Sequence, residues 1–240
     1  MEAELQSLIE NYKISASVVD LVRTTPITFL VGVSGAGKDT IKQRLLETGK
    51  YHHIVSHTTR PMRENGGVME QDGVEYHFVS KAQVADMLRA GAFIEAKMYS
   101  GNVYGTSVAE IEMARNEGKI ALTDIEVQGV AEYKAISNTV IAEFILPPSY
   151  SEWQRRLRAR YGEKGADPSD ITKRMQAAVA ELREALAKPY YHFVVNENLD
   201  EAVKAADSIA HNQDKFTTVD RSFRVWAEQL LRELQSGHAS

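Results

Sequence analysis

The chain has 240 residues, a formal net charge of −5 and no cysteine. This length suffices for one domain with appendages and a full hydrophobic core, and the lack of cysteine excludes disulfides, thiolate metal sites and thiol catalysis. The negative charge argues against a general binder of nucleic acids or anionic membranes. Because we find no apolar run long enough to span a bilayer and no signal-peptide pattern in residues 1–23, we expect a cytoplasmic protein that binds neither nucleic acid nor membrane.

The first predicted element is a short amphipathic helix within residues 1–23, where Leu5, Leu8, Ile9 and Tyr12 recur at helical spacing. From Pro26 to about residue 212, strand-like and helix-like segments alternate, which predicts a mostly parallel sheet flanked by helices. The predicted strands are residues 27–32, 54–59, 74–79, 92–98, 119–125, 139–146 and 191–196. Several of these strands follow one another within residues 54–98, which indicates an inserted, mostly antiparallel lobe.

Helix starts are predicted by serines that stand three residues before a glutamate or glutamine, the spacing of a capping box. The three pairs are Ser80 with Gln83, Ser107 with Glu110, and Ser149 with Glu152. A later helix opens at Asp167-Pro168 and closes at Lys188-Pro189. Its apolar face comprises Met175, Val179, Leu182 and Leu186.

A separate tail follows Lys215. One helical stripe runs along it, formed by Val219, Phe223, Trp226, Leu230 and Leu234. This pattern is typical of a helix that packs on its own domain, and it also fits a surface for a homodimer or another partner.

A phosphate-binding loop follows the first predicted strand of the alternating region. Gly32, Gly35 and Gly37 leave backbone N–H groups that can converge on phosphate oxygens at the start of the next helix. Lys38 can reach the β- and γ-phosphates, as the Gly-x-x-x-x-Gly-Lys pattern requires. The predicted ATP-binding residues of this loop are Gly32, Ser34, Gly35, Ala36, Gly37, Lys38, Asp39 and Thr40.

The loop has one irregular position. Asp39 stands where a hydroxyl normally ligates Mg²⁺, and Thr40 comes one place later. A carboxylate is also a hard oxygen ligand for Mg²⁺, so the pattern still predicts a nucleotide bound with Mg²⁺.

A second group of candidate binding residues follows the predicted strand 54–59. Arg60 and Arg63 straddle Pro61, so that two guanidinium groups can point at one small anion with bidentate geometry. Tyrosine hydroxyls further along can add neutral donors to a phosphate, and Glu95 can accept two hydrogen bonds from a base edge.

Together and in this order, these blocks closely resemble the guanylate kinase family. The resemblance covers residues 27 to 198 and includes Gly-x-Ser-Gly-Ala-Gly-Lys at 32–38, Ser-x-Thr-Thr-Arg-Pro-x-Arg at 56–63 and Asp-Gly-x-x-Tyr-x-Phe-Val-Ser at 72–80. It continues with Phe-Ile-Glu at 93–95, Gly-Asn-x-Tyr-Gly-Thr at 101–106 and Asp-Ile-Glu-Val-Gln-Gly at 124–129. Members of this family transfer the γ-phosphoryl group of ATP to GMP or dGMP, so the resemblance implies these substrates.

The resemblance also implies an architecture. We expect an α/β P-loop fold of three layers with a mostly parallel central sheet, an inserted, mainly antiparallel lobe for the nucleoside monophosphate at about residues 56–107 and a mobile lid at about 150–175. The kinase-like domain would occupy residues 25–212, between an N-terminal helical extension at 1–24 and a C-terminal amphipathic helix at 213–240. The two terminal segments could support a homodimer.

Residue roles follow from the same resemblance, position by position. The GMP phosphate would be held by Ser56, Arg60, Arg63, Tyr76 and Tyr104, and guanine would be read by Glu95, Thr106 and Glu126. Asp124 would lie near Mg²⁺ and the phosphates, Asn196 would contact the adenine side, and Asp39 and Asp124 are the candidate Mg²⁺ ligands. The catalytic positive charges would come from Lys38, Arg60, Arg156, Arg160 and Arg174, the last three in the lid.

Two positions depart from the family pattern, and two alternative functions remain. Asp39 replaces the usual hydroxyl, a feature shared with kinases that act on ribose 1,5-bisphosphate, and such a sugar-phosphate kinase is the first alternative. Glu126 stands where an aspartate is common, and its extra methylene could weaken selection of guanine. The second alternative is a non-catalytic guanylate-kinase-like module that binds phosphopeptides. Such modules typically lose the loop lysine, whereas Lys38 is present here.

Overall fold

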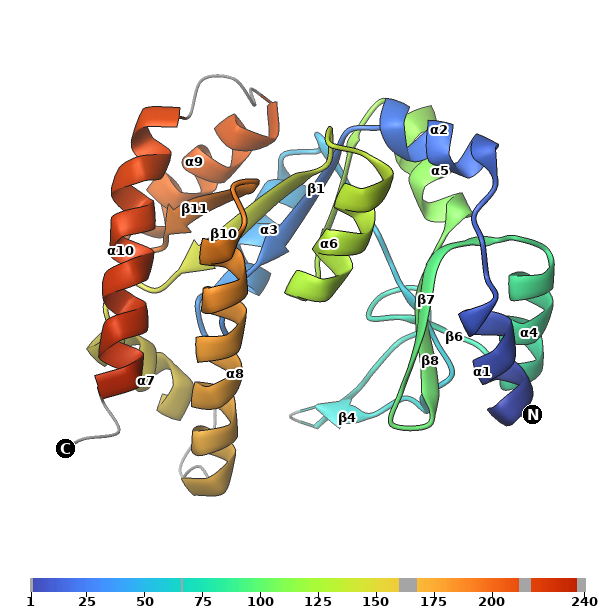
Figure 1. The fold of residues 1–240 in the computed structure, drawn as a ribbon, viewed down its shortest axis with the longest axis horizontal. Helices are drawn as coiled ribbons and strands as arrows, with labels where there is room; N and C mark the ends of the chain where they lie inside the picture. The colour runs from blue at the N-terminus through green and yellow to red at the C-terminus, as the bar shows by residue number, and fades with distance from the viewer. Residues whose placement is uncertain (1, 66, 160–167, 212–216, 237–240) are drawn as a thin grey trace. The chain divides into compact units, whose positions relative to one another are not determined.

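The structure is a computed structural model that describes residues 2–65, 67–159, 168–211 and 217–236 (Figure 1). The chain divides into two units. Unit 1 combines residues 1–26 with 51–121, and unit 2 combines residues 27–50 with 122–240. Each unit is therefore built from two stretches that are distant in the sequence.

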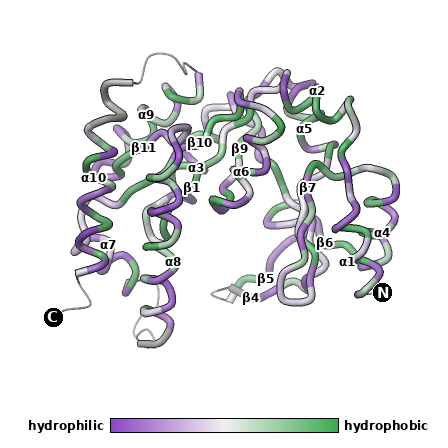
Figure 2. The backbone as a smooth tube through the Cα atoms, in the orientation of Figure 1, coloured by the Kyte–Doolittle hydropathy of each residue, from purple (hydrophilic) through white to green (hydrophobic). Residues whose placement is uncertain are grey.

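Unit 2 is built on a parallel sheet. The strand order is β11-β10-β1-β9, comprising β11 (Tyr191–Val195), β10 (Ile141–Leu146), β1 (Ile27–Val31) and β9 (Ile120–Asp124). Strand β2 (Tyr51–His53) belongs to unit 1. Strands β1 and β11 both pair with β10 in parallel. Every residue of β1 and β10 is buried, as expected for parallel strands that are covered on both faces, and Figure 2 colours these strands mainly hydrophobic.

Helices surround this sheet. They are α3 (Lys38–Glu47), α6 (Val127–Ile136), α7 (Tyr150–Ala159), α8 (Pro168–Ala187), α9 (Leu199–His211) and α10 (Thr217–Ser236). Helix α9 packs against α3 and β11, and α10 packs against α8, α7 and β11. Helices α8 and α10 run side by side in Figure 1. No helix in the described part of the chain has the length and apolar character to cross a membrane.

Unit 1 contains a smaller, mixed sheet. Its order is β6-β3-β8-β7, comprising β6 (His77–Phe78), β3 (His57–Thr58), β8 (Asn102–Ser107) and β7 (Phe93–Tyr99). Strands β7 and β3 are antiparallel to β8, and only the short β3–β6 pair is parallel. A two-stranded hairpin of β4 (Glu64–Asn65) and β5 (Val68–Met69) completes the strands of this unit. The expected mainly antiparallel lobe is therefore present.

The helices of unit 1 are α1 (Glu2–Glu10), α2 (Ala16–Thr24), α4 (Lys81–Arg89) and α5 (Val108–Asn116). Helix α1 lies beside α4 in Figure 1 and also packs against β7, and α2 packs against α5. Leu5 of α1 is fully buried in one cluster with Val84, Leu88, Phe93 and Val103. The N-terminal segment thus contributes to the core of unit 1, and it forms two helices where the sequence predicted one.

The starts of the helices agree only in part with the capping boxes predicted from the sequence. Ser80 and Gln83 form the complete predicted capping box at the start of α4. Ser149 caps α7 by accepting a hydrogen bond from Glu152 N, whereas the Glu152 carboxylate pairs with arginines. The box predicted at Ser107 is wrong, because Ser107 makes no side-chain cap bond. Glu110 instead accepts a hydrogen bond from Val55 N and pairs with His77.

Candidate active site

The glycine loop of unit 2 has a backbone that only glycine adopts readily. Gly32 and Gly37 have φ angles of 134° and 97°. A Cβ atom on Gly32 would lie 2.3 Å from Ile145 O, and one on Gly37 would lie 2.2 Å from Asn196 Nδ2. The loop leads from the end of β1 into the N-terminus of α3, where Gly37 is the N-cap residue. Unpaired backbone N–H groups at such a terminus suit an anion.

Lys38 begins α3, and its ammonium group turns back over the loop. It donates hydrogen bonds to Gly32 O and, at 3.4 Å, to Val33 O. Side chains distant in the sequence support the same loop. Trp153 Nε1 donates to Ser34 O at 2.8 Å, and Arg174 Nη1 donates to Ser34 Oγ at 2.9 Å.

Asn196 also braces the loop. Its side chain is buried, and Nδ2 donates to Ala36 O at 2.8 Å. Its backbone carbonyl accepts a hydrogen bond from Arg156 Nη2 at 3.2 Å. Two of the predicted lid arginines, Arg156 and Arg174, therefore touch the loop or its brace. The third, Arg160, lies outside the described residues, as do the other residues of the predicted lid from 161 to 167.

Asp124 ends β9, and its Oδ1 accepts a hydrogen bond from Lys42 Nζ of α3 at 2.5 Å. Burial acts to raise the pKa of Asp124, but the ammonium groups of Lys42 and Lys38 outweigh it and the pKa is lowered. Asp124 is therefore an anion beside the phosphate loop. Glu126 is exposed at the N-cap position of α6, and Asp39 is exposed in the first turn of α3.

In unit 1, Arg60 is buried and paired with Glu70. Arg60 Nη1 and Nη2 donate to the two carboxylate oxygens of Glu70 at 2.8 and 2.9 Å, and Nη1 also donates to Pro61 O at 2.7 Å. Glu70 Oε2 additionally accepts from Arg63 N at 2.8 Å. The hydrogen bonds from Arg60 lower the pKa of Glu70, and the Glu70 carboxylate raises the pKa of Arg60. The pair fixes the guanidinium, while the Arg63 side chain is exposed.

Aromatic rings lie beside this guanidinium. It lies 5.2 Å from the ring centroid of Tyr76, whose ring is 6.0 Å from that of Tyr104. Ser56 is half-buried, and its carbonyl accepts a hydrogen bond from His77 N at 2.9 Å, next to Tyr76. The structure therefore brings Arg60, Tyr76 and Tyr104 together.

Glu95 of β7 and Thr106 of β8 face each other across the sheet of unit 1. Glu95 Oε1 accepts hydrogen bonds from Thr106 N at 3.0 Å and Thr106 Oγ1 at 2.9 Å. Thr106 is buried, whereas Glu95 is half-buried. These contacts hold the carboxylate in one orientation.

Sequence reasoning missed three contributors to these sites. Lys42 stands four residues after Lys38, and this helical spacing is a signal that could have indicated it. No local sequence pattern indicated Glu70 or Trp153, because only the folding of the chain brings Glu70 to Arg60 and Trp153 to Ser34.

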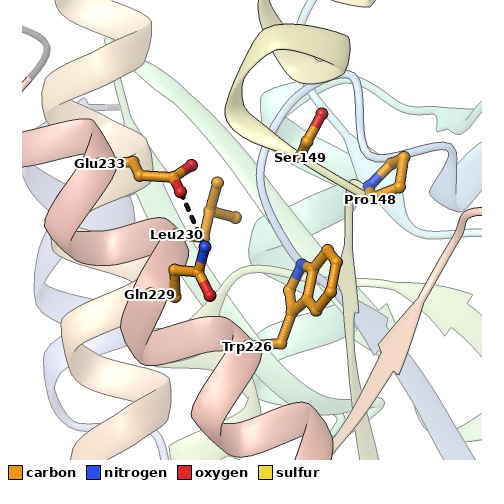
Figure 3. Close-up of a pocket in the computed structure, with 6 residues that line it drawn as sticks. All are labelled: Pro148, Ser149, Trp226, Gln229, Leu230 and Glu233. Atoms are coloured by element: carbon orange, nitrogen blue, oxygen red, sulfur yellow. Dashed lines mark hydrogen bonds between the residues drawn. The ribbon is translucent and has the colours of Figure 1, made fainter.

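Two pockets of unit 2 lie beside α10 and share Trp226. Figure 3 shows one of them, lined by Pro148, Ser149, Trp226, Gln229, Leu230 and Glu233, where Gln229 Nε2 donates to Glu233 Oε1 at 3.0 Å. The other is lined in part by Val194, Glu201 and Phe223. No predicted site residue lines either pocket.

Residues 24–213 match the family model of guanylate kinase. A guanylate kinase of Thermus thermophilus is 40% identical over 75% of this chain and 77% of its own length. A guanylate kinase of Schizosaccharomyces pombe is 36% identical over 82% of this chain and 96% of its own length.

Guanylate kinase 1 of Oryza sativa subsp. japonica is 40% identical over 70% of this chain, which spans only 43% of that longer protein. Among solved structures, the crystal structure of guanylate kinase from Anaplasma phagocytophilum has a TM-score of 0.56 and 27% sequence identity. The match covers 80% of this chain and 89% of that one.

Proposed function

The chain belongs to the guanylate kinase family, and we propose that it transfers the γ-phosphoryl group of ATP to GMP or dGMP. The products are ADP and the nucleoside diphosphate, so the enzyme is a nucleoside monophosphate kinase. The observation that carries this proposal is the coexistence of the lysine-bearing glycine loop in unit 2 with the Arg60 cluster and the Glu95–Thr106 pair in unit 1.

Unit 2 would bind ATP through the glycine loop. Its backbone N–H groups and Lys38 would contact the phosphates, and Arg156 and Arg174 would add positive charge. Arg156 donates a hydrogen bond to the Asn196 carbonyl that braces the loop and Arg174 donates one to Ser34 Oγ, so both guanidinium groups are held at the loop. Arg160 would belong to the same set by sequence.

Unit 1 would bind the monophosphate. The three hydrogen bonds of Arg60 use three of its five N–H donors, which leaves two for a phosphate oxygen. Ser56, Arg63, Tyr76 and Tyr104 would add further donors. By sequence, Glu95, Thr106 and Glu126 would read guanine through its N1, N2 and O6 positions.

Members of this family generally need a divalent metal with ATP, and we propose Mg²⁺. The residues present fit it, because Asp124 is anionic beside the loop and Asp39 stands in the first turn of α3. Mg²⁺ typically uses one or two carboxylates together with substrate phosphates. When bound, the ion would neutralise charge on the transferring phosphoryl group.

Phosphoryl transfer requires in-line positioning and dispersed positive charge more than covalent help. Lys38, Arg60 and the lid arginines supply such charge, and no general base is needed because the acceptor phosphate is already an anion. Water must be kept away from ATP, so we expect turnover only when both nucleotides are bound.

A coupled assay of ADP release tests the proposal directly. The protein is supplied with ATP and Mg²⁺, and the acceptors GMP, dGMP, AMP, CMP, UMP and ribose 1,5-bisphosphate are compared. We expect selective turnover of GMP and dGMP that stops when the metal is chelated. Turnover of ribose 1,5-bisphosphate alone would contradict the acceptor, and ATP binding without any turnover would indicate a binding module.

A further inference from the structure

Tyr12 makes two hydrogen bonds to one residue of the sheet in unit 1. Its hydroxyl donates to Phe93 O at 2.6 Å and accepts from Phe93 N at 2.9 Å. A single side chain thus satisfies both backbone groups of Phe93, as a neighbouring strand would do. The contact joins residues that are 81 positions apart in the sequence.

Phe93 stands at an irregularity of β7. Phe93 is opposite Ser107, but Glu95 is opposite Thr106, so two steps along β7 correspond to one along β8. This register shift is a β-bulge with one extra residue, which disrupts the ladder and re-aims the side chains that follow. Glu95 is the first residue of β7 after the bulge that regains a partner on β8.

The geometry on the other side of the bulge depends on this register. Thr106 N donates to Glu95 Oε1 at 3.0 Å, so the Glu95 carboxylate bonds directly to the backbone of β8. A Cβ atom on Gly105 would lie 2.7 Å from Glu95 O and 3.0 Å from Phe93 Cδ1, so the two strands are closely packed here. A slip by one residue would turn Glu95 to the opposite face of the sheet.

Tyr12 is held in place by the helix before it. Leu5 of α1 is fully buried against Val84, Leu88 and Phe93, and Glu4 pairs with Arg89 of α4 at 2.5 Å. The residues that match the guanylate kinase family model begin at 24, so α1 and Tyr12 lie outside that match.

We propose that Tyr12 is a positioning residue that fixes the bulge of β7 and thereby the orientation of Glu95 toward the guanine base. This role rests on the proposed function, since it requires Glu95 to read guanine. Tyr12 does not touch the substrate. It acts through the backbone of Phe93, two residues before Glu95, and it gives the N-terminal helix α1 a part in substrate selection.

The variant Tyr12→Phe tests this role, because it keeps the aromatic ring and removes only the hydroxyl. Tyr99→Phe is the matched control, since Tyr99 is on the same strand and its side chain is 72% exposed. For each protein, kcat and KM are measured with GMP, with IMP (which lacks the 2-amino group) and with ATP, well below the Tm of that protein.

We expect Tyr12→Phe to raise the KM for GMP by about tenfold, the loss typical of one well-made hydrogen bond, and to reduce the GMP preference over IMP by a similar factor. The KM for ATP should not change, and Tyr99→Phe should match the wild type. A purely structural role would lower the Tm without changing the GMP-to-IMP ratio.

An unchanged KM for GMP and an unchanged ratio in Tyr12→Phe would overturn the positioning role, even if the Tm falls. A wild-type protein that does not phosphorylate GMP at all would overturn the proposed function itself and the positioning role with it. The wild-type measurement therefore separates the two failures.

Discussion

Arg60 shows how a partner changes what a side chain can do. The sequence suggests two equivalent guanidinium groups at Arg60 and Arg63, but in the structure only Arg60 is buried, and both oxygens of Glu70 hold it. A buried charge persists only when it is paired and hydrogen-bonded. Glu70 therefore fixes the Arg60 guanidinium before any ligand arrives, at the cost of neutralising part of its charge. The Arg63 side chain is instead exposed at the surface.

Glu143 is a buried acid that no proposed role uses. It lies in the middle of β10 with no exposed surface, and neither carboxyl oxygen has a hydrogen-bond partner among the described residues. Burial raises its pKa well above the ordinary value, and the nearby carboxylate of Asp207 adds to this shift. Because the folded state holds the proton more tightly than the unfolded state, the stability of the fold should fall as the pH rises above about 4.3.

The variant Glu143→Gln should therefore stabilise the protein progressively with pH, because glutamine is neutral at every pH. We expect its free energy of unfolding to exceed that of the wild type at pH 8, with a difference that grows from pH 4 by at most about 1.4 kcal/mol per pH unit. Urea unfolding across this range is the measurement, with the exposed Glu228→Gln as control. A difference that stays constant between pH 4 and pH 8 would contradict the buried, protonated state.

At the scale of elements, strands and helices were predicted well where apolar residues recur regularly and where proline ends a helix. The parallel strands β1, β9, β10 and β11 lie within the predicted segments, and α8 ends before Lys188-Pro189 as expected. Strand β8 (Asn102–Ser107) lies outside the predicted strands, because Asn102 and Gly105 are residue types that favour turns. Its pairing with β7 and β3 overrides that local preference.

Two serines at predicted capping boxes, Ser80 and Ser107, allow a paired test of which hydroxyl stabilises the start of a helix. Ser80 Oγ accepts from Gln83 N at 3.2 Å at the start of α4, so Ser80→Ala should lower the free energy of unfolding by about 1 kcal/mol. Ser107 is buried with its hydroxyl unpaired among the described residues, so Ser107→Ala should leave stability unchanged or raise it. Equal losses in both variants, measured by urea unfolding, would count against the assigned caps.

The candidate site was predictable wherever its residues form local patterns. The glycine loop is one continuous stretch, and the structure brings Glu95 to Thr106 and Arg60 to Tyr76 and Tyr104. Among the supports, the helical spacing after Lys38 could have indicated Lys42, which pairs with Asp124. What the sequence could not indicate are the supports Glu70 for Arg60 and Tyr12 for the bulge at Phe93. Each of these two supports depends on packing between distant segments, which leaves no periodic signal. The proposed roles of the site residues remain predictions.

At the scale of the whole molecule, the phosphate loop depends on much of unit 2. Ser34 receives hydrogen bonds from α7 and α8, and Ala36 receives one from Asn196 after β11. Side chains from α7, from α8 and from the residue after β11 therefore hold one loop. A homodimer through the terminal helices stays a prediction, and α1 and α10 each pack on their own unit.

The rate of GDP formation from ATP and GMP tests the central claim, when the wild type, Lys38→Ala and the exposed control Lys204→Ala are compared. We expect turnover by the wild type and by Lys204→Ala. In Lys38→Ala, kcat should fall by about two or more powers of ten while the circular dichroism spectrum is retained, because the charge that stabilises the transferring phosphoryl group is lost. No GDP from the wild type, or an undiminished kcat in Lys38→Ala, would contradict the account.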